Sequence, residues 1–331
     1  MLWYLDRKIS AALIYKKNYN FFNQAHFDQT TNDFFMKALS RNERLEVEYF
    51  PCEDEFDVKK LKGKFDVILL ANNRFDATPE VLHDITKSTI PVIVKTGDPH
   101  HAEKYNQIEL HEKFKIDAYW SLQPKEYFYK YYPKDFKFKE ILWGIEPSKF
   151  QNLKSFNERI SDKILNSGNV GRSNIKSKIG HLFSKDINSA AYFYKLRTMC
   201  NNLSFVDYAG MKGNSYVNED YAEYLSRYKG AIATGTFYPV IKFFEIPSAG
   251  CLTFMEITEK NHGQYLGFKD NKNAIFINEK NYQKKFDEYL SDPENIKWEE
   301  IANEGREHTL NVASNDRGVD SLIELIEEFI K

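Results

Sequence analysis

Short apolar runs alternate along this chain with longer amphipathic segments, and this alternation strongly limits what the chain can fold into. The run FDVILLA at 65–71 is typical of a buried strand, because its Val, Ile and Leu residues are contiguous. In the first half, further strands are predicted at 10–15, 90–95, 117–121 and 139–142, and helices at 30–38, 79–86, 101–114 and 124–131. Alternating strands and helices imply βαβ crossovers, and therefore a parallel sheet with helices on both faces.

The same pattern begins again in the second half, after a polar stretch at 151–162 that we interpret as an interdomain linker. Strands are predicted there at 163–167, 203–208, 230–234, 251–255 and 274–277, and helices at 188–199, 221–228, 239–248, 282–291, 298–309 and 318–330. The sequence thus predicts an α/β protein with two doubly wound parallel-sheet domains. Open parallel sheets bind ligands beyond the carboxyl ends of their strands, so a cleft between two such domains is the expected place for a site.

Charge and cysteine content exclude several classes of protein. The 331 residues include 46 Lys and Arg against 48 Asp and Glu, so no overall field holds nucleic acid or an anionic membrane. Cys52, Cys200 and Cys251 lie far apart without a CxxC motif, which favours reduced thiols and no zinc site. Charges at positions 6–8 leave no room for a signal-peptide apolar core, so a cytoplasmic location is expected.

The segment NSGNVGR directly follows the first strand expected in the second domain. Gly168 and Gly171, with Asn169 between them, permit close approach of the backbone to a ligand, and the next helix would present free N–H groups. Arg172 and Lys176 add positive charge that suits a diphosphate. The segment matches neither GxGxxG nor a Walker loop, so an ordinary glycine turn with solvated basic side chains explains it equally well.

A second candidate segment, GTFYPVIKFFEIPSAG, begins at Gly235 after another expected strand. Thr236 is predicted to cap a helix that opens at Pro239, which would make a second cradle for a phosphate. Lys242 and Glu245 lie three apart on this helix, which is also the spacing of an ordinary surface ion pair. Glu245 stands among Phe and Ile residues, where its carboxylate needs a specific partner, and ribose hydroxyls would provide one.

A third candidate, KTGDPHH, follows a strand of the first domain. Its carboxylate and imidazoles, from Asp98, His100 and His101, have the chemistry of a base, an orienting group or a ligand. In an extended segment the two adjacent histidines would point in opposite directions, so they are not expected to bind one metal ion. An Asp-Pro turn with exposed histidines is the alternative that this chemistry alone favours.

Several segments, taken in order, resemble the GT-B glycosyltransferases. In the first half these are IPVIVKTGDPHH, IDAYWSLQPKEYFYKYYP and ILWGIEPSKF, and in the second SGNVGR, YFYKLR, YAEYLSRYKGAIAT, KFFEIPSAGCLTF and a tail containing IANEGREHTL. The second set is similar to the C-terminal glycosyltransferase domain of the spore-maturation-protein type, with its R-x-FE-x-x-A-x-G helix and IA-x-x-G-R tail. The resemblance covers most of residues 60–310.

The resemblance implies a GT-B fold, in which two Rossmann-like domains face a cleft. An acceptor-side domain is expected at 1–150, a nucleotide-sugar-binding domain at 160–315, and a helix at 316–331 that crosses back to the first domain. The implied activity is that of a metal-independent, hexosyltransferase-like enzyme, which moves a sugar from a nucleotide-diphosphate donor to a glycan, lipid or protein acceptor. No cofactor and no nucleic-acid partner are expected, and peripheral membrane contact is compatible with this activity.

The resemblance also implies roles for particular residues. Glu245 matches the family glutamate that binds the ribose, and Lys242 matches the arginine three residues before it. Tyr208 lies where the nucleobase usually packs. Asp98 and His100 fall where related enzymes contact the donor sugar or the acceptor, and these two are the expected catalytic residues. The expected donor-binding residues are Gly168, Asn169, Gly171, Arg172, Lys176, Tyr208, Thr236, Phe237, Tyr238, Lys242 and Glu245.

The sequence departs from the family pattern at two of these positions. Phe237 stands where retaining relatives often carry the first of two glutamates, and Lys242 lacks the bidentate fork of the arginine that it replaces. Arg172 and Lys176 match the positive residues at the diphosphate. The departures leave open whether the chemistry is retaining or inverting. A non-catalytic sugar-nucleotide or glycan-binding module, and an epimerase or phosphorylase of the same fold, remain the alternatives.

Overall fold

The computed structural model describes residues 7–17, 31–171, 187, 189–210 and 221–330. It divides the chain into two compact units, one of Met1–Gly144 with Asn315–Lys331 and the other of Ile145–Ser314. The polar stretch at 151–162, which we expected to be a linker, lies inside the second unit. It contains a 3₁₀ turn (Phe156–Glu158) and the beginning of a strand, because Phe156 is buried in the core of that unit.

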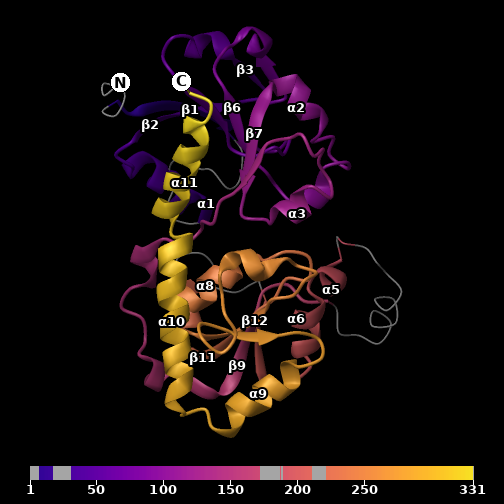
Figure 1. Cartoon of the computed structure of the whole chain (residues 1–331), viewed down its shortest axis with the longest axis vertical. Coiled ribbons are helices and arrows are strands. Elements are labelled where there is room, and N and C mark those ends of the chain that lie inside the picture. The colour runs from indigo at the N-terminus through magenta and orange to yellow at the C-terminus, as the bar shows by residue number, and fades with distance from the viewer. Residues whose placement is uncertain (1–6, 18–30, 172–186, 188, 211–220, 331) are drawn as a thin grey trace. The chain divides into compact units, whose positions relative to one another are not determined.

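The first unit contains a parallel sheet of six strands in the order β2-β1-β4-β6-β7-β8 (Figure 1). These strands are β1 (Ile9–Lys16), β2 (Leu45–Cys52), β4 (Val67–Leu70), β6 (Val92–Lys95), β7 (Ile116–Ser121) and β8 (Phe138–Glu140). Their helices are α1 (Thr31–Arg41), α2 (Glu109–Phe114) and α3 (Lys125–Phe128). The predicted parallel sheet of a doubly wound domain is thus confirmed.

Successive residues of each central strand point to opposite faces of this sheet. In β4, Leu69 joins one apolar core with Phe35 of α1, whereas Leu70 joins a second core with Phe114 of α2. Both faces of the strand are therefore buried, which explains why its sequence is an unbroken apolar run.

The helix predicted at 79–86 is wrong. This segment forms β5 (Val81–His83), which pairs in parallel with β3 (Glu55–Asp57) in a separate two-stranded sheet, followed by a 3₁₀ turn (Ile85–Lys87). The Thr78 hydroxyl, just before this segment, donates a hydrogen bond to the carbonyl of Asn72. A pairing with a segment some 25 residues earlier is a non-local contact that local periodicity does not reveal.

The last helix, α11 (Asn315–Glu327), belongs to the first unit and packs beside α1 (Figure 1). Its apolar face, which includes Val319 and Leu322, lies in the same core as Phe35. The guanidinium of Arg41 forms two hydrogen bonds to the Asp316 carboxylate, at 2.7 and 2.9 Å. The end of the chain therefore returns to the unit in which the chain began.

The second unit contains a parallel sheet in the order β10-β9-β11-β12-β13. Its strands are β9 (Ile160–Ser167), β10 (Val206–Ala209), β11 (Tyr228–Ala233), β12 (Leu252–Glu256) and β13 (Ile275–Ile277). Its helices are α5 (Ala190–Phe193), α6 (Lys195–Cys200), α7 (Tyr221–Leu225), α8 (Lys242–Ser248), α9 (Tyr282–Ser291) and α10 (Ile296–Ala313). Among the described residues, no helix has the length and apolar content needed to cross a membrane.

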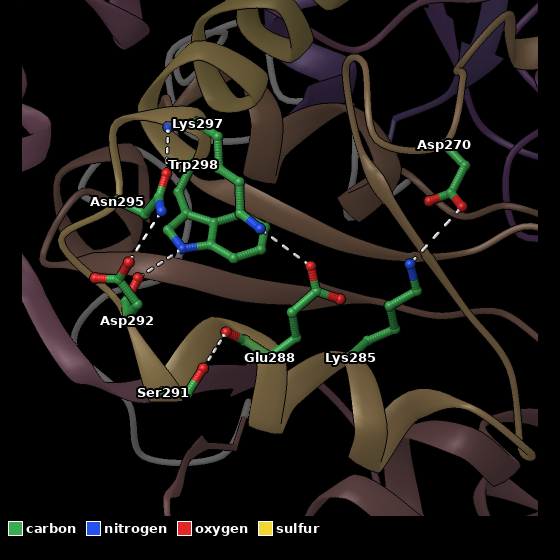
Figure 2. A network of polar contacts seen from close by, with 8 residues as sticks. All are labelled: Asp270, Lys285, Glu288, Ser291, Asp292, Asn295, Lys297 and Trp298. Carbon is green, nitrogen blue, oxygen red and sulfur yellow. Dashed lines mark hydrogen bonds and ion pairs between the residues drawn. The ribbon is translucent and has the colours of Figure 1, made fainter.

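Polar contacts fix the corner between α9 and α10 in this unit (Figure 2). The Asn295 side chain accepts a hydrogen bond from the Lys297 backbone N–H at 3.2 Å and so caps the start of α10. The Trp298 indole donates to the Asp292 carbonyl at 2.9 Å, and Lys297 pairs with Glu288 of α9 at 3.1 Å. These contacts fix the corner between α9 and α10, whose buried residues Phe286 and Ile301 lie in the core of this unit.

Candidate functional site

Polar side chains of the second unit gather where β9, β11 and β12 end. Gly168 follows β9 with a φ of 112°, a backbone conformation that favours glycine. A Cβ at this position would lie 2.8 Å from Nη1 of Arg197 and 3.0 Å from Cε of Lys242. The Tyr208 hydroxyl donates a hydrogen bond to the Gly168 carbonyl at 3.0 Å. Two cationic side chains thus lie against the same glycine, and a larger residue at this position would displace their ends.

Arg197 of α6 is the most deeply buried cation of this group, with 2% of its surface exposed. Its Nη2 donates to the Thr234 carbonyl at 2.7 Å, and its guanidinium lies 4.2 Å from the centre of the Tyr194 ring. Among the described residues, its Nε has no hydrogen-bond partner and no carboxylate lies within ion-pair distance of its guanidinium. Burial lowers the pKa of Arg197. A buried cation without a counter-ion is costly, and an anionic ligand would compensate it.

Lys242 and Glu245 are not the ordinary surface pair that their spacing allowed, because their side chains are only 13% and 15% exposed. Lys242 donates from Nζ to the Tyr221 hydroxyl at 2.6 Å, and that hydroxyl donates to Oγ of Ser167 at 3.0 Å. The Lys242 Nζ lies 3.9 Å from Oε2 of Glu245. The Glu245 carboxylate accepts no hydrogen bond from the described residues, and burial raises its pKa even though Lys242 opposes the shift.

Glu256, at the end of β12, is a second buried carboxylate of this edge, with 5% of its surface exposed. It accepts a hydrogen bond from the Gly235 N–H at 3.0 Å, and Asn261 donates to the Gly235 carbonyl at 2.9 Å. Burial raises the pKa of Glu256 to about 7, although the Gly235 N–H and the charge of Arg197 oppose that shift. These bonds fix the loop that leads from β11 to α8.

The predicted helix start at Thr236 and Pro239 is wrong. Helix α8 begins at Lys242, after an Ile241 that caps it without a side-chain hydrogen bond. The Thr236 hydroxyl instead accepts from the backbone N–H of Lys195, at the start of α6, over 3.3 Å. A cradle of N–H groups at Thr236 is therefore absent, because the helix starts one turn later than its Pro suggested.

Phe237 and Tyr238 of this loop pack in an aromatic cluster. The Phe237 ring lies 5.1 Å from Tyr192 and 5.6 Å from Phe193, and Lys260 Nζ lies 4.5 Å from its centre. Tyr238 is buried, with its ring 5.2 Å from Phe193. Packing thus explains the aromatic residue at position 237.

The glycine loop after β9 is described only in part. Asn169 is exposed, and the Gly171 N–H donates to the Thr198 hydroxyl at 2.9 Å. Arg172 and Lys176 lie outside the described residues. Of the expected donor-binding residues, the structure gathers the following at one edge of the sheet: Gly168, Tyr208, Lys242 and Glu245.

The candidate residues of the first unit follow β6. The segment forms a 3₁₀ turn (Pro99–His101), so the extended conformation, in which the adjacent histidines would point in opposite directions, does not occur. The two imidazole rings have centres 4.3 Å apart, and one ligand atom each of Asp98, His100 and His101 lie within 4.8 Å of one another. Nδ1 of His100 lies 3.1 Å from the Tyr127 hydroxyl, and burial lowers the pKa of His100.

Sequence reasoning missed Arg197 and Glu256, and it gave no role to Lys95, the first residue of KTGDPHH. Lys95 ends β6 with its Nζ 3.9 Å from the centre of the Trp143 ring, and burial lowers its pKa to about 7. Arg197 lies in YFYKLR, a segment that carries the family resemblance, and that was its only signal in the sequence. Glu256 was marked only by following a predicted strand.

Residues 190–324 match a protein family described as glycosyl transferase-like. No curated protein matches the sequence at a significant level. Among solved structures, the chain is similar to a sucrose-phosphate synthase from Thermosynechococcus elongatus, with a TM-score of 0.61, 10% identity, and 97% of this chain and 99% of that one covered. It is also similar to a glycosyltransferase from Rickettsia africae ESF-5, with a TM-score of 0.57, 11% identity, and 98% and 99% covered.

A third similar structure is HepE of Anabaena in complex with UDP-glucose, with a TM-score of 0.52, 10% identity, and 97% of this chain and 100% of that one covered. At such identities a structural likeness shows the fold alone. The family match covers most of the second unit, including α6 and α8, which carry Arg197, Lys242 and Glu245. The chain therefore contains a glycosyl transferase-like segment, at residues 190–324, and has the GT-B fold of two parallel-sheet domains.

Proposed function

We propose that this protein transfers a sugar from a nucleotide-diphosphate donor to an acceptor, and that its second unit holds the donor. The observation that carries this proposal is the buried guanidinium of Arg197 beside Gly168, without a carboxylate partner among the described residues. Lys242 lies against the same glycine. Two cations at the end of a parallel strand suit a diphosphate, and the structurally similar HepE is described in complex with UDP-glucose.

The ribose assignment rests on Glu245. A largely buried carboxylate that accepts no hydrogen bond from the described residues retains its full capacity for donors. Two adjacent hydroxyls of a ribose would supply donors and would compensate the cost of burying the charge. Tyr208 supports the same placement of the nucleoside, because the residue is 45% exposed and its hydroxyl donates a hydrogen bond to the Gly168 carbonyl. An exposed, fixed aromatic ring suits the face of a nucleobase.

The proposed chemistry is mainly electrostatic. As the bond between the sugar and the diphosphate breaks, negative charge develops on the leaving diphosphate. Arg197 and Lys242 are held in place before the reaction by Thr234 and Tyr221, so they stabilise that charge without rearranging. No metal ion is needed for this part of the reaction. On the first unit, Asp98 and His100 are proposed to contact the donor sugar or the acceptor.

Thermal unfolding of the full chain against UDP, GDP, ADP, CMP and NAD tests the donor assignment. A nucleotide at ~100 times its dissociation constant stabilises the fold by ~2.7 kcal/mol, which gives a clear shift in Tm. We expect a shift with one nucleoside diphosphate, which Glu245→Ala reduces strongly. Glu304→Ala, at an exposed position of α10, is the matched control and keeps the shift. The absence of a shift with every diphosphate would contradict the proposal.

A turnover assay tests the transfer itself. The nucleotide-sugar of the base identified above is incubated with the protein and with glycan, lipid or protein acceptors, and release of the nucleoside diphosphate is measured. We expect release that depends on both the protein and one class of acceptor. Donor binding without release in the presence of any acceptor would instead indicate a non-catalytic sugar-nucleotide-binding module. The Phe at position 237, where retaining relatives often carry a glutamate, is compatible with that alternative.

A further inference from the structure

We propose that Asp98, His100 and His101 of the first unit form a binding site for a divalent transition-metal ion. One carboxylate oxygen and two imidazole nitrogens are ligands that Zn²⁺, Co²⁺ and Ni²⁺ share. One candidate ligand atom of each residue lies within 4.8 Å of the others. Among the described residues, no other group of three or more His, Cys, Asp and Glu side chains comes so close together.

The backbone conformation is what brings these ligands together. Asp98 precedes a 3₁₀ turn (Pro99–His101), and Pro99 opens that turn with its fixed φ. Consecutive side chains of a 3₁₀ helix are about 120° apart, whereas those of a strand point to opposite faces. In the turn the His100 and His101 rings can therefore approach each other, and their centres lie 4.3 Å apart.

Small side-chain rotations would bring the three ligand atoms to the spacing of a metal coordination sphere. Bonds of about 2.0–2.2 Å from zinc to nitrogen and oxygen place tetrahedral ligand atoms about 3.3 Å apart. The 4.8 Å within which the candidate ligand atoms lie is wider than this. Because all three residues are only partly buried, their side chains have room to close that gap and an ion can reach them. Three protein ligands leave at least one position for water or for an oxygen of a substrate.

Tyr127 supplies the outer-shell contact that such a site requires. Its hydroxyl lies 3.1 Å from Nδ1 of His100, and its side chain is 1% exposed. When Nδ1–H donates to the Tyr127 hydroxyl, Nε2 carries the lone pair that binds the metal. Metal-binding histidines usually have a partner of this kind, which fixes the ring and its tautomer. Tyr127 is therefore a positioning residue of the proposed site.

Occupation of this site has a consequence for transfer, and this consequence rests on the proposed function. Asp98 and His100 are the two residues proposed to contact the donor sugar or the acceptor. An ion that takes their carboxylate and imidazole lone pairs removes those contacts. We therefore expect bound metal to lower the rate of transfer, so that the site acts as an inhibitory metal sensor.

The binding claim is tested with Co²⁺ alone, titrated into the full chain after treatment with a chelator. Coordination by nitrogen and oxygen ligands gives Co²⁺ visible ligand-field absorption, which Zn²⁺ removes when it displaces Co²⁺. We expect one Co²⁺ per chain and displacement by Zn²⁺. His101→Gln, which preserves side-chain volume, should lose the absorption, and Tyr127→Phe should weaken binding by about 10–100-fold. His83→Ala, on β5, is the matched control and should bind as the wild type does.

Two outcomes would overturn the metal site. One is the absence of Co²⁺ absorption with the wild type, and the other is equal binding by wild type and His101→Gln. The thermal unfolding of each variant without metal shows that a loss of absorption is not a loss of fold. If Co²⁺ binds as expected but transfer is equally fast with and without it, the metal site stands. The role proposed for Asp98 and His100 in transfer is then wrong.

Discussion

The Nη1 atom of Arg197 lies 2.8 Å from the point that a Cβ at Gly168 would occupy. The positive φ of 112° at Gly168 and this contact together explain why a glycine follows β9. The buried guanidinium of Arg197 therefore lies next to the backbone that follows β9. In the proposed function, this is where the diphosphate of the donor binds.

Gly168→Ala is expected to damage both the fold and donor binding. The new methyl group would meet Arg197 and the Lys242 side chain, and alanine disfavours the positive φ. We expect a loss of about 1–3 kcal/mol in the free energy of unfolding, and weaker binding of the nucleoside diphosphate. Chemical denaturation and calorimetric titration measure the two effects. Gly63→Ala is a matched control for positive φ, because a Cβ at Gly63 meets no atom within 4 Å. A Gly168→Ala variant that loses no more stability than this control would contradict the packing argument.

Arg197→Met should separate stability from binding. Without ligand, relief of an uncompensated buried charge offsets the lost hydrogen bond to Thr234, so the free energy of unfolding should change by less than about 1 kcal/mol. Binding of the nucleoside diphosphate should fall by about 10–100-fold, because a charged hydrogen bond contributes about 1.5–3 kcal/mol. Calorimetric titration measures this, with Arg227→Met, at a partly exposed side chain, as the control. Unaltered affinity in Arg197→Met would remove Arg197 from the proposed site.

Glu256 predicts a dependence of stability on pH. Its pKa in the folded protein, about 7, is above the value of 4.5 for an exposed glutamate, so folding favours the protonated form. Its contribution is therefore fully present below pH 4.5 and is lost as the pH rises through 7. Glu256→Gln removes this titration. Relative to that variant, the wild type should lose up to about 3 kcal/mol of unfolding free energy between pH 4 and pH 8. Parallel stability curves for the two proteins over this range would contradict the prediction.

Gly318→Ala tests how α11 is held on the first unit. A Cβ at Gly318 would lie 2.7 Å from Cβ of Trp143 and 3.1 Å from the Leu142 carbonyl. Alanine has the higher helix propensity, so a loss of stability can come only from this close packing. We expect a loss of about 1–3 kcal/mol in chemical denaturation, whereas Arg317→Ala, at an exposed position of the same helix, should have little effect. A gain of stability in Gly318→Ala would show that α11 packs less closely than the structure indicates.

The strands were predictable from the sequence where burial on both faces left an apolar run, as in β4 and β6. β2 was missed because it is an edge strand, in which Glu46 and Glu48 interrupt the apolar run. β5 was taken for a helix because its partner, β3, is remote in the sequence. The two misses have different causes, because β2 was hidden by its own charged residues, whereas β5 was hidden by a pairing between distant segments.

The candidate site was predictable only in part for a similar reason. Lys242 and Glu245 could be found because their spacing and apolar neighbours are local features. Arg197 could not, because an arginine in a short helix is usually solvated, and here it is buried by the ends of β9 and β11. The approach of His100 and His101 was not predicted, because the sequence did not show whether the segment after Asp98 turns or stays extended.

The central claim is that Arg197 and Lys242 bind the diphosphate of a nucleotide donor, and the measurement that tests it most directly is a comparison of ligands that differ only in phosphate. Calorimetric titration of the full chain with the nucleoside, its monophosphate and its diphosphate should show affinity rising with each phosphate. In Arg197→Met that rise should be largely lost, while affinity for the nucleoside alone is unchanged. Equal affinity of the wild type for all three ligands, or a rise that Arg197→Met preserves, would contradict the account.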